Sequence, residues 1–337
     1  MPRTITVLLL VAALAGGQEQ GGAAGEDDAE LGANRLDKTN REAAAQVRRT
    51  VAQKGRNLGA QLRGLRAEDV VVIGGLFDFT QEILKAFRVP HRVVRPADLE
   101  YLELKTPERM VFFLNCHLLD RKFAGSLPNE PRPDAATARR RLAAALKAAG
   151  LDGPSAPGKA IRERFEEVMY FAGSDYSAKG LKKLGAAVRK GAWAVSMDWA
   201  LLAAEKALPN SIRWTGHTTY EETVKVQASA AGRRHSLMQG VFGEKKNVKW
   251  WLETESYLFK VTAKHTTLIE SRALAARYHG RKKVVVLLEP GKGRWLHALA
   301  HGYLQRGNSG DAAVMMRLLL NYLLEKSLQN WKRDTSD

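Results

Sequence analysis

The sequence contains a single cysteine, Cys116, among 337 residues. One thiol cannot form an intrachain disulfide, so a small fold held together by disulfides is excluded. Beyond the N-terminus there is also no uninterrupted apolar run of the roughly 18 residues that a membrane helix needs. A chain of this length can instead bury enough apolar surface to be stable without disulfides.

Acidic residues are scarce relative to basic ones. Lysine and arginine number 53 against 36 aspartates and glutamates, which gives a formal net charge of +17 and a pI near 10.0. Hydrophobic residues make up 45% of the chain and charged residues 26%. These values are typical of a globular protein and exclude wholesale disorder and collagen-like or coiled-coil architecture.

The N-terminus has the order of a secretory signal. Arg3 precedes an apolar run from Ile5 to Ala15, which is followed by small residues through Gly17 and a polar stretch from Gln18. The run is too short to span a bilayer. We therefore expect a signal peptide over residues 1–17 and a secreted or periplasmic protein; an uncleaved N-terminal anchor is the alternative. No transmembrane segment is expected after the signal.

The positive charge predicts anionic partners without naming one. Basic clusters are scattered along the chain, at 139–141, 182–183, 233–234, 245–246 and 281–283. Such scattering is typical of the solvated surface of a basic protein, and export makes nucleic acid an unexpected partner. We therefore expect the protein to bind an anionic polymer of the cell envelope or a small anionic ligand.

Two segments precede the main domain. Residues 18–39 are rich in Gly, Ala, Gln and acid and are predicted to be a flexible linker. Residues 40–65 carry apolar side chains at steps of three, four and seven, which predicts one amphipathic helix. Its apolar stripe is expected to pack on the domain behind it, or alternatively to mediate dimerisation.

The main domain, predicted over residues 66–330, begins with a βαβ pattern. Continuous β-branched or aromatic runs at 69–76, 91–95 and 110–115 predict strands buried in a parallel sheet, with a short helix at 80–87. The region 118–158 is rich in Pro, Gly and Arg and is predicted to leave the sheet. Together these segments predict an α/β fold with a flavodoxin-like, mostly parallel sheet and helices on both faces.

The second half continues this pattern and then changes. Helices are predicted at 161–171 and 179–189, and a strand at 192–197 runs directly into a helix at 198–207. Short strands are expected at 257–262 and 266–270. A hairpin is predicted where Pro290 to Gly293 separates two apolar runs, followed by a C-terminal helix from 311 to 326.

The order of these pieces resembles the class I glutamine amidotransferase-like superfamily, in particular its secreted, ThuA-like or uncharacterised bacterial members. The stretches that carry the resemblance are residues 70–84, 110–116, 191–202, 234–242 and 290–305 with the terminal helix. In catalytic members a cysteine lies at a strand-to-helix elbow and a later His-x-Glu pair completes a triad. Here the elbow falls at Ser196 to Trp199 without a cysteine, and no His-x-Glu occurs. The family triad is therefore not predicted.

Several residues are candidates for chemistry. Cys116 follows a predicted parallel strand, at the end where open α/β sheets bind ligands. It is interpreted as a buried structural cysteine or as a nucleophile, and Ser196 as a second, weaker nucleophile. A histidine partner would be His117, His217 or His301. His297 and His301 are spaced by four, but no third ligand accompanies them, so no metal site is predicted and no cofactor.

These residues define one expected crevice. Gly74, Gly75, Asn115, Cys116, Ser196 and Asp198 all follow or end predicted strands, so they are expected to meet at one edge of the sheet. Asp198 is interpreted as the cap of the helix that begins there. The sequence favours an exported, non-catalytic α/β domain that binds a ligand or an envelope partner. The alternative is a hydrolase that uses Cys116 or Ser196.

Overall fold

The protein is described from a computed structural model in which residues 38–53, 57–75, 80–116, 135–153, 159, 162, 176–253, 255–302 and 309–336 are placed. The chain divides into two compact units, Met1–Asp37 with Asp120–Ser174 and Lys38–Leu119 with Asp175–Asp337. Within the first unit lies helix α5 (Ala135–Ala148). The predicted signal peptide falls outside the described residues, as do nearly all of the linker and of the helix expected at 161–171. The remaining elements belong to the second unit.

A nine-stranded sheet forms the centre of the second unit, in the order β2-β1-β3-β4-β11-β10-β9-β6-β7. One half is parallel: β1 (Val70–Ile73), β2 (Arg92–Val94), β3 (Val111–Leu114), β4 (Trp193–Met197) and β11 (Arg294–Ala298). Every residue of β1, β3 and β4 is buried. This burial explains why these strands are continuous apolar runs, since both of their faces are covered.

The other half of the sheet is antiparallel. Its strands are β10 (Lys283–Leu288), β9 (His265–Glu270), β6 (Glu222–Ala228) and β7 (Val248–Leu252). The predicted hairpin is present, because β10 pairs with β11 across a turn in which Gly291 has a φ of 67°. A separate two-stranded sheet pairs β5 (Ile212–Thr218) with β8 (Tyr257–Val261). Strands β5, β6 and β7 were not predicted.

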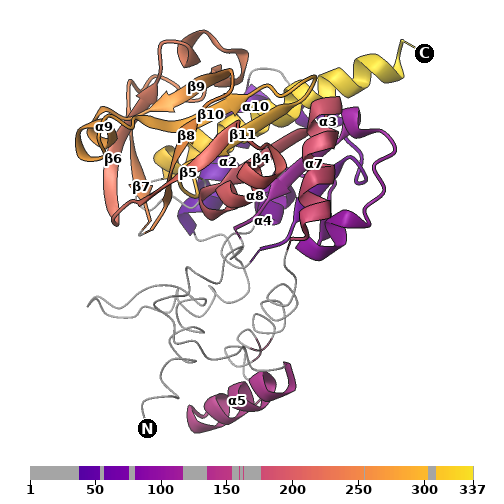
Figure 1. Cartoon of the computed structure of the whole chain (residues 1–337), viewed down its shortest axis with the longest axis vertical. Coiled ribbons are helices and arrows are strands. Elements are labelled where there is room, and N and C mark those ends of the chain that lie inside the picture. Colours follow the sequence, from indigo (N-terminus) through magenta and orange to yellow (C-terminus); the bar gives the residue numbers. More distant parts are fainter. Residues whose placement is uncertain are drawn as a thin grey trace. The chain divides into compact units, whose positions relative to one another are not determined.

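Helices cover both faces of the sheet (Figure 1). On one face α7 (Ala178–Lys190) packs against α8 (Leu201–Ala207), which follows the short 3-10 turn η5 (Asp198–Ala200). On the other face lies the long C-terminal helix α10 (Ser309–Asp334), whose Tyr322 hydroxyl donates to the carbonyl oxygens of Ala194 and Arg294 at 3.1 Å each. The short helix α4 (Thr80–Ala86) connects β1 to β2. These elements confirm the predicted α/β class with a flavodoxin-like parallel region.

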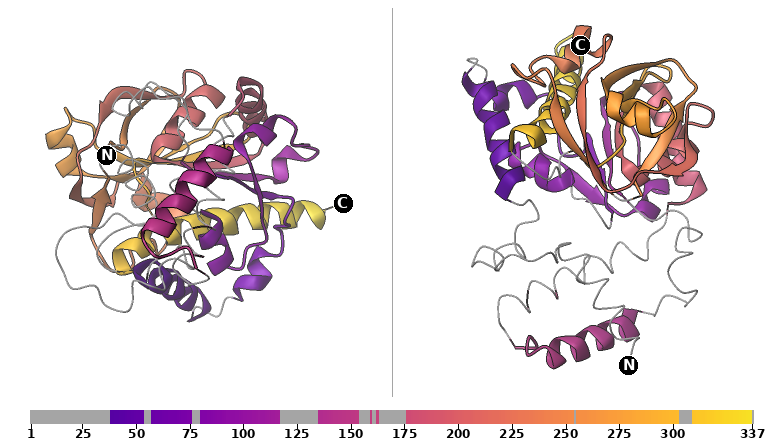
Figure 2. Two further views of the ribbon diagram at one scale, coloured as in Figure 1. Left: turned by 90° about the horizontal axis from the view of Figure 1, so that it is seen from below. Right: turned by 90° about the vertical axis from the view of Figure 1, so that its left-hand side faces the viewer.

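The segment predicted as one helix over 40–65 contains two helices, α2 (Lys38–Gln53) and α3 (Leu58–Leu62). Asn57 has an extended backbone and caps α3, since its side chain accepts a hydrogen bond from the Ala60 N–H at 3.2 Å, so a single continuous helix is wrong here. Helix α2 packs against α10, as Figure 2 shows. The apolar stripe therefore faces the protein's own domain.

The described helices include none that is long and apolar enough to cross a membrane. Three-ten turns complete the second unit: η2 (Pro96–Glu100), η3 (Pro107–Arg109), η6 (Gly232–Arg234) and η7 (Ser236–Met238), together with the short helix α9 (Arg272–Arg277). The core lies between the sheet and its two helical layers, where Trp193, Trp295 and Tyr322 are fully buried. This rigid framework fixes the strand ends that carry the candidate site.

Candidate active site

Three adjacent strands bring chemically competent side chains to one edge of the sheet. Cys116 follows β3, Asp198 follows β4 and His301 lies three residues beyond β11. The strands are neighbours in the order β3-β4-β11 and run parallel, so their carboxyl ends point the same way. This is the edge at which open α/β sheets bind their ligands.

Cys116, His301 and Glu253 form a hydrogen-bonded chain. The Cys116 Sγ lies 2.8 Å from the His301 Nε2, and the His301 Nδ1 lies 2.5 Å from the Glu253 Oε2. Cys116 has no exposed surface and His301 only 5%, whereas the Glu253 side chain is 17% exposed. A thiol, an imidazole bonded to it and a carboxylate that orients the imidazole are the three parts of a nucleophilic triad.

Electrostatics favour a charged imidazole in this chain. Burial by itself lowers the pKa of His301, but the neighbouring Cys116 sulfur and the Glu253 carboxylate outweigh it and hold that pKa well above its usual value. A protonated His301 donates from both ring nitrogens, to Glu253 and to Sγ. A histidinium next to a cysteine favours the thiolate, which is the nucleophilic form.

Asp198 occupies the strand-to-helix elbow and has an unusual backbone. Its φ is 47°, in the left-handed region that aspartate enters more readily than most residues. Its Oδ2 is 3.9 Å from the His301 Nδ1, and its Oδ1 accepts a hydrogen bond from the Tyr257 N–H at 3.2 Å. Burial raises the pKa of Asp198 well above its usual value, with Glu253 adding to this effect and His301 opposing it. A protonated Asp198 can therefore sit beside the Glu253 carboxylate without adding a second negative charge.

The role of Asp198 differs from the expectation. The sequence indicates a cap for the following helix, but no side-chain capping hydrogen bond is found at η5 or α8. The Asp198 carboxyl is instead bonded to β8 and faces the triad. A sharp elbow is present without the glycines that usually surround one, because the aspartate itself adopts the left-handed conformation.

Asn115 and Gly75 support the position of Cys116. The Asn115 Oδ1 accepts from the Thr80 N–H at the start of α4, and its Nδ2 donates to Gln81. A Cβ on Gly75 would lie 2.3 Å from the Cys116 carbonyl oxygen, so the backbone of β1 and that of Cys116 approach too closely for any side chain. Gly75 is thus a close-packing residue of the expected crevice, and residues 115 and 116 fill the space beside its backbone.

Gly74 and Ser196 have structural partners of their own. The Gly74 N–H donates to the Val94 carbonyl oxygen at 2.8 Å and extends the pairing of β1 with β2. The Ser196 Oγ accepts from the Trp295 Nε1 at 2.8 Å and lies 2.9 Å from the His297 Nδ1. Burial lowers the pKa of His297 to about 3, so this imidazole is a poor base at neutral pH. Ser196 lacks the activation that a serine nucleophile requires.

The two histidines spaced by four serve different partners. His297 lies within β11 and contacts Ser196, whereas His301 lies beyond the strand and contacts Cys116. Of the other histidines considered, His117 falls outside the described residues and His217 is exposed on β5. The structure therefore brings together Cys116, His301 and Asp198 from the predicted set. It leaves Ser196 with His297 on the neighbouring strand.

Glu253 was missed by sequence reasoning. It directly follows β7, a strand that was not predicted, and lies 48 positions before the histidine it contacts. The available signal was the alternation of apolar and polar residues in β6 and β7, which is typical of half-buried antiparallel strands. That pattern would have placed a carboxylate at a strand end but not beside His301.

Cys116, Asp198 and His301 could also offer ligands to a metal ion, since one donor atom from each lies within 4.8 Å of the others. Thiolate, imidazole and carboxylate are the donors that zinc prefers. However, ligands bound to one tetrahedral zinc at about 2.0–2.3 Å stand more than about 3 Å apart. The Sγ and Nε2 atoms, at 2.8 Å, are closer together than two ligands of one zinc ion would be. The geometry fits a nucleophile and its base better than a metal centre.

No protein family matches the chain, and no curated protein is similar to it in sequence. Solved structures do match. A Thermoplasma acidophilum protein described as a GMP synthase subunit shares 9% identity over 81% of this chain and 98% of its own, with a TM-score of 0.40. A glutamine amidotransferase of Thermotoga maritima shares 9% over 79% and 97%, with a TM-score of 0.36. A β-galactosidase of Rahnella sp. R3 shares 11% over 74% and 30%, with a TM-score of 0.33.

These similarities are distant, so the activities of those proteins cannot be transferred to this chain. Its function has to be argued from its own residues. What the sequence resemblance implied about the fold agrees with the topology described above. The described strands and helices form an α/β fold whose central sheet has a parallel half and an antiparallel half.

Proposed function

We propose that this protein is a thiol-dependent hydrolase or acyl transferase in which Cys116 is the nucleophile. The observation that carries the proposal is the chain of contacts from the Cys116 Sγ through His301 to Glu253, at 2.8 Å and 2.5 Å. This geometry favours a hydrolase, which the sequence offered as the alternative, over a non-catalytic binding domain. It also selects Cys116 over Ser196, whose histidine partner has a pKa of about 3.

The reaction follows from the roles of the three residues. The Cys116 thiolate attacks the carbonyl carbon of an amide or ester, and a sulfur–carbon bond forms. The protonated His301 gives its Nε2 proton to the departing nitrogen or oxygen, whose bond to the carbonyl carbon breaks. A water molecule then attacks the thioester while His301 takes a proton from it, and Cys116 leaves as the thiolate. Glu253 keeps the imidazole oriented through Nδ1.

Alkylation of Cys116 by iodoacetamide tests the proposal without knowledge of the substrate. An ordinary thiol with a pKa near 8.5 reacts about tenfold faster for each pH unit between roughly pH 6 and 8. A thiolate paired with His301 should react at a nearly constant rate over that range. The measurement is the rate of single-site alkylation by intact-protein mass spectrometry on the folded chain.

Two variants make the experiment specific. His301→Asn should restore the steep pH dependence, whereas His297→Asn, which changes a histidine that contacts Ser196, should leave the rate unchanged. A substrate screen with esters and amides, including glutamine, should then show activity that disappears in Cys116→Ala and persists in Ser196→Ala. Activity that persists in Cys116→Ala would refute the proposal.

One observation favours a second candidate, the non-catalytic domain that binds a ligand or an envelope partner. Cys116 has no exposed surface, and a substrate must reach it. If Cys116 reacts only under denaturing conditions and no substrate is turned over, the buried chain of contacts is structural and the binding domain is the better conclusion. Added zinc that slows alkylation, with chelator restoring it, would instead favour a metal centre at Cys116, Asp198 and His301.

We also propose that the protein is exported and acts in the periplasm or outside the cell. The support is the sequence pattern of residues 1–17, in which one basic residue precedes a short apolar run and small residues. N-terminal sequencing of protein from the extracytoplasmic fraction should begin between Gly16 and Gln20. An intact Met1 in that fraction would refute cleavage.

A further inference from the structure

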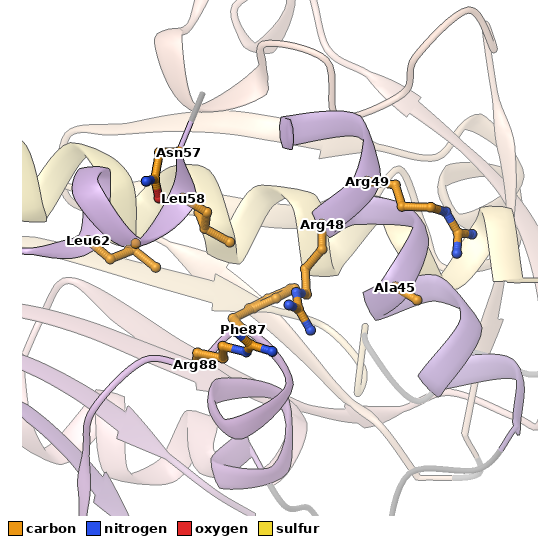
Figure 3. A pocket seen from close by; sticks show the side chains of 9 residues that line it. Ala45, Arg48, Arg49, Asn57, Leu58, Leu62, Phe87 and Arg88 are labelled. Carbon is orange, nitrogen blue, oxygen red and sulfur yellow. The ribbon is translucent and has the colours of Figure 1, made fainter. Parts of the chain in front are cut away.

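A pocket of about 490 Å³ lies among the N-terminal helices (Figure 3). Its walls come from α2, α3 and the end of α4. Phe87 and Leu62 supply a buried apolar floor, with 1% and 5% of their surfaces exposed. Its volume falls within the range of small-molecule sites in proteins.

Positive charge surrounds this floor. Arg48, Arg49 and Arg88 line the pocket, and none of the three makes an ion pair or side-chain hydrogen bond within the described structure. Some other arginines in the same unit are paired: Arg109 contacts Asp69 and Asp334, and Arg95 contacts Asp98. The three pocket arginines have no acidic partner within the described residues.

Two of these arginines reach toward the same point. In Figure 3 the Arg48 side chain extends from α2 and that of Arg88 from the end of α4, and both lie beside Phe87, while Arg49 points away along α2. Two guanidinium groups directed at one place repel each other unless an anion lies between them. Guanidinium groups bind phosphate and carboxylate through paired hydrogen bonds.

We propose that this pocket binds a small organic anion, with its phosphate or carboxylate group between Arg48 and Arg88 and its apolar part on Phe87 and Leu62. The site is distinct from the triad. Helix α4 begins beside Asn115, whose side chain accepts a hydrogen bond from the Thr80 N–H. The helix ends just before the start of β2. Phe87 and Arg88 are therefore at the opposite edge of the parallel strands from Cys116.

Isothermal titration calorimetry of the full chain with phenyl phosphate tests the proposal. Inorganic phosphate presents the anion alone and phenol the ring alone, so phenyl phosphate should bind more tightly than either. The double variant Arg48→Gln/Arg88→Gln should weaken binding of phenyl phosphate at least about tenfold, through loss of the paired hydrogen bonds. Arg48→Lys/Arg88→Lys keeps both charges but loses the planar guanidinium groups. Its affinity for phenyl phosphate should lie between that of the original chain and that of the glutamine double variant.

The matched control removes the same charge elsewhere. Arg189 and Arg213 are exposed and make no side-chain bond within the described residues, so Arg189→Gln/Arg213→Gln lowers the net charge by the same two units. Its affinity should stay within about twofold of the original chain, at matched ionic strength. Equal losses in the two glutamine pairs would overturn the proposal in favour of non-specific attraction. Absence of binding to the unaltered chain, or equal affinity for inorganic and phenyl phosphate, would overturn it as well.

Discussion

Acidification should destabilise this protein through His297. Burial lowers the pKa of this imidazole from 6.5 to about 3, and a backbone hydrogen bond at Ser196 opposes this shift without cancelling it. In the unfolded chain the same group takes up a proton near pH 6.5. Between these two values the unfolded state binds more protons than the folded one, so stability is complete above pH 6.5 and is lost as the pH falls toward 3.

The magnitude follows from the width of that interval. Each pH unit within it changes the free energy of unfolding by about 1.4 kcal/mol. At pH 4.5, two units below the unfolded value, His297 should have cost the protein about 2.7 kcal/mol. This is a large share of the 5–15 kcal/mol that typically separates folded from unfolded states.

The assay is denaturant unfolding at several pH values between 7.5 and 4.5, followed by tryptophan fluorescence, since Trp193 and Trp295 are buried in the same core. The variant His297→Asn keeps an acceptor for the Ser196 hydroxyl but cannot take up a proton. Its stability should depend less on pH than that of the original chain, by about 1.4 kcal/mol per unit. His279→Asn, at an exposed histidine with a φ of 52°, is the matched control and should keep the original pH dependence.

Other buried groups do not obscure the comparison. Asp198 has a raised pKa, so it binds a proton more readily when folded and makes stability rise as the pH falls, which is the opposite sign. Because the difference between the original chain and His297→Asn is taken at each pH, this contribution cancels. Equal pH dependence in the two proteins would refute the reasoning and would restore His297 as a base for Ser196.

Two further predictions concern close backbone contacts. Gly185→Ala would place a Cβ 1.9 Å from the Ala207 carbonyl oxygen and should therefore push α7 away from α8. We expect it to lower the free energy of unfolding, measured with denaturant, by about 1–3 kcal/mol. The control Gly59→Ala makes only an ordinary 3.4 Å contact in α3, so it should leave the stability unchanged or raise it. In Gly75→Ala the new Cβ would lie 2.3 Å from the Cys116 carbonyl oxygen, so the free energy of unfolding should fall by a similar amount. The rate of Cys116 alkylation at neutral pH should change as well. An unchanged rate would show that the position of the sulfur does not depend on this packing.

The parallel half of the sheet was accessible from sequence, but much of the antiparallel half was not. The runs at 70–73, 111–114 and 193–197 are apolar at nearly every position because both faces of these strands are buried. Strands β5 and β6 are half-exposed and carry polar residues at alternate positions, so their apolar content is low. Their place in the fold depends on pairing with distant strands more than on local composition.

The amino-acid sequence by itself determined the α/β class, the C-terminal hairpin and the presence of a cysteine at a strand end. Only the tertiary structure decided which groups meet there. Cys116 and His301 are 185 positions apart, and they touch because β3 and β11 both pair with β4. The same pairing places His297 opposite Ser196. Strand order and register arise from packing over the whole core, and no local pattern of residues encodes them.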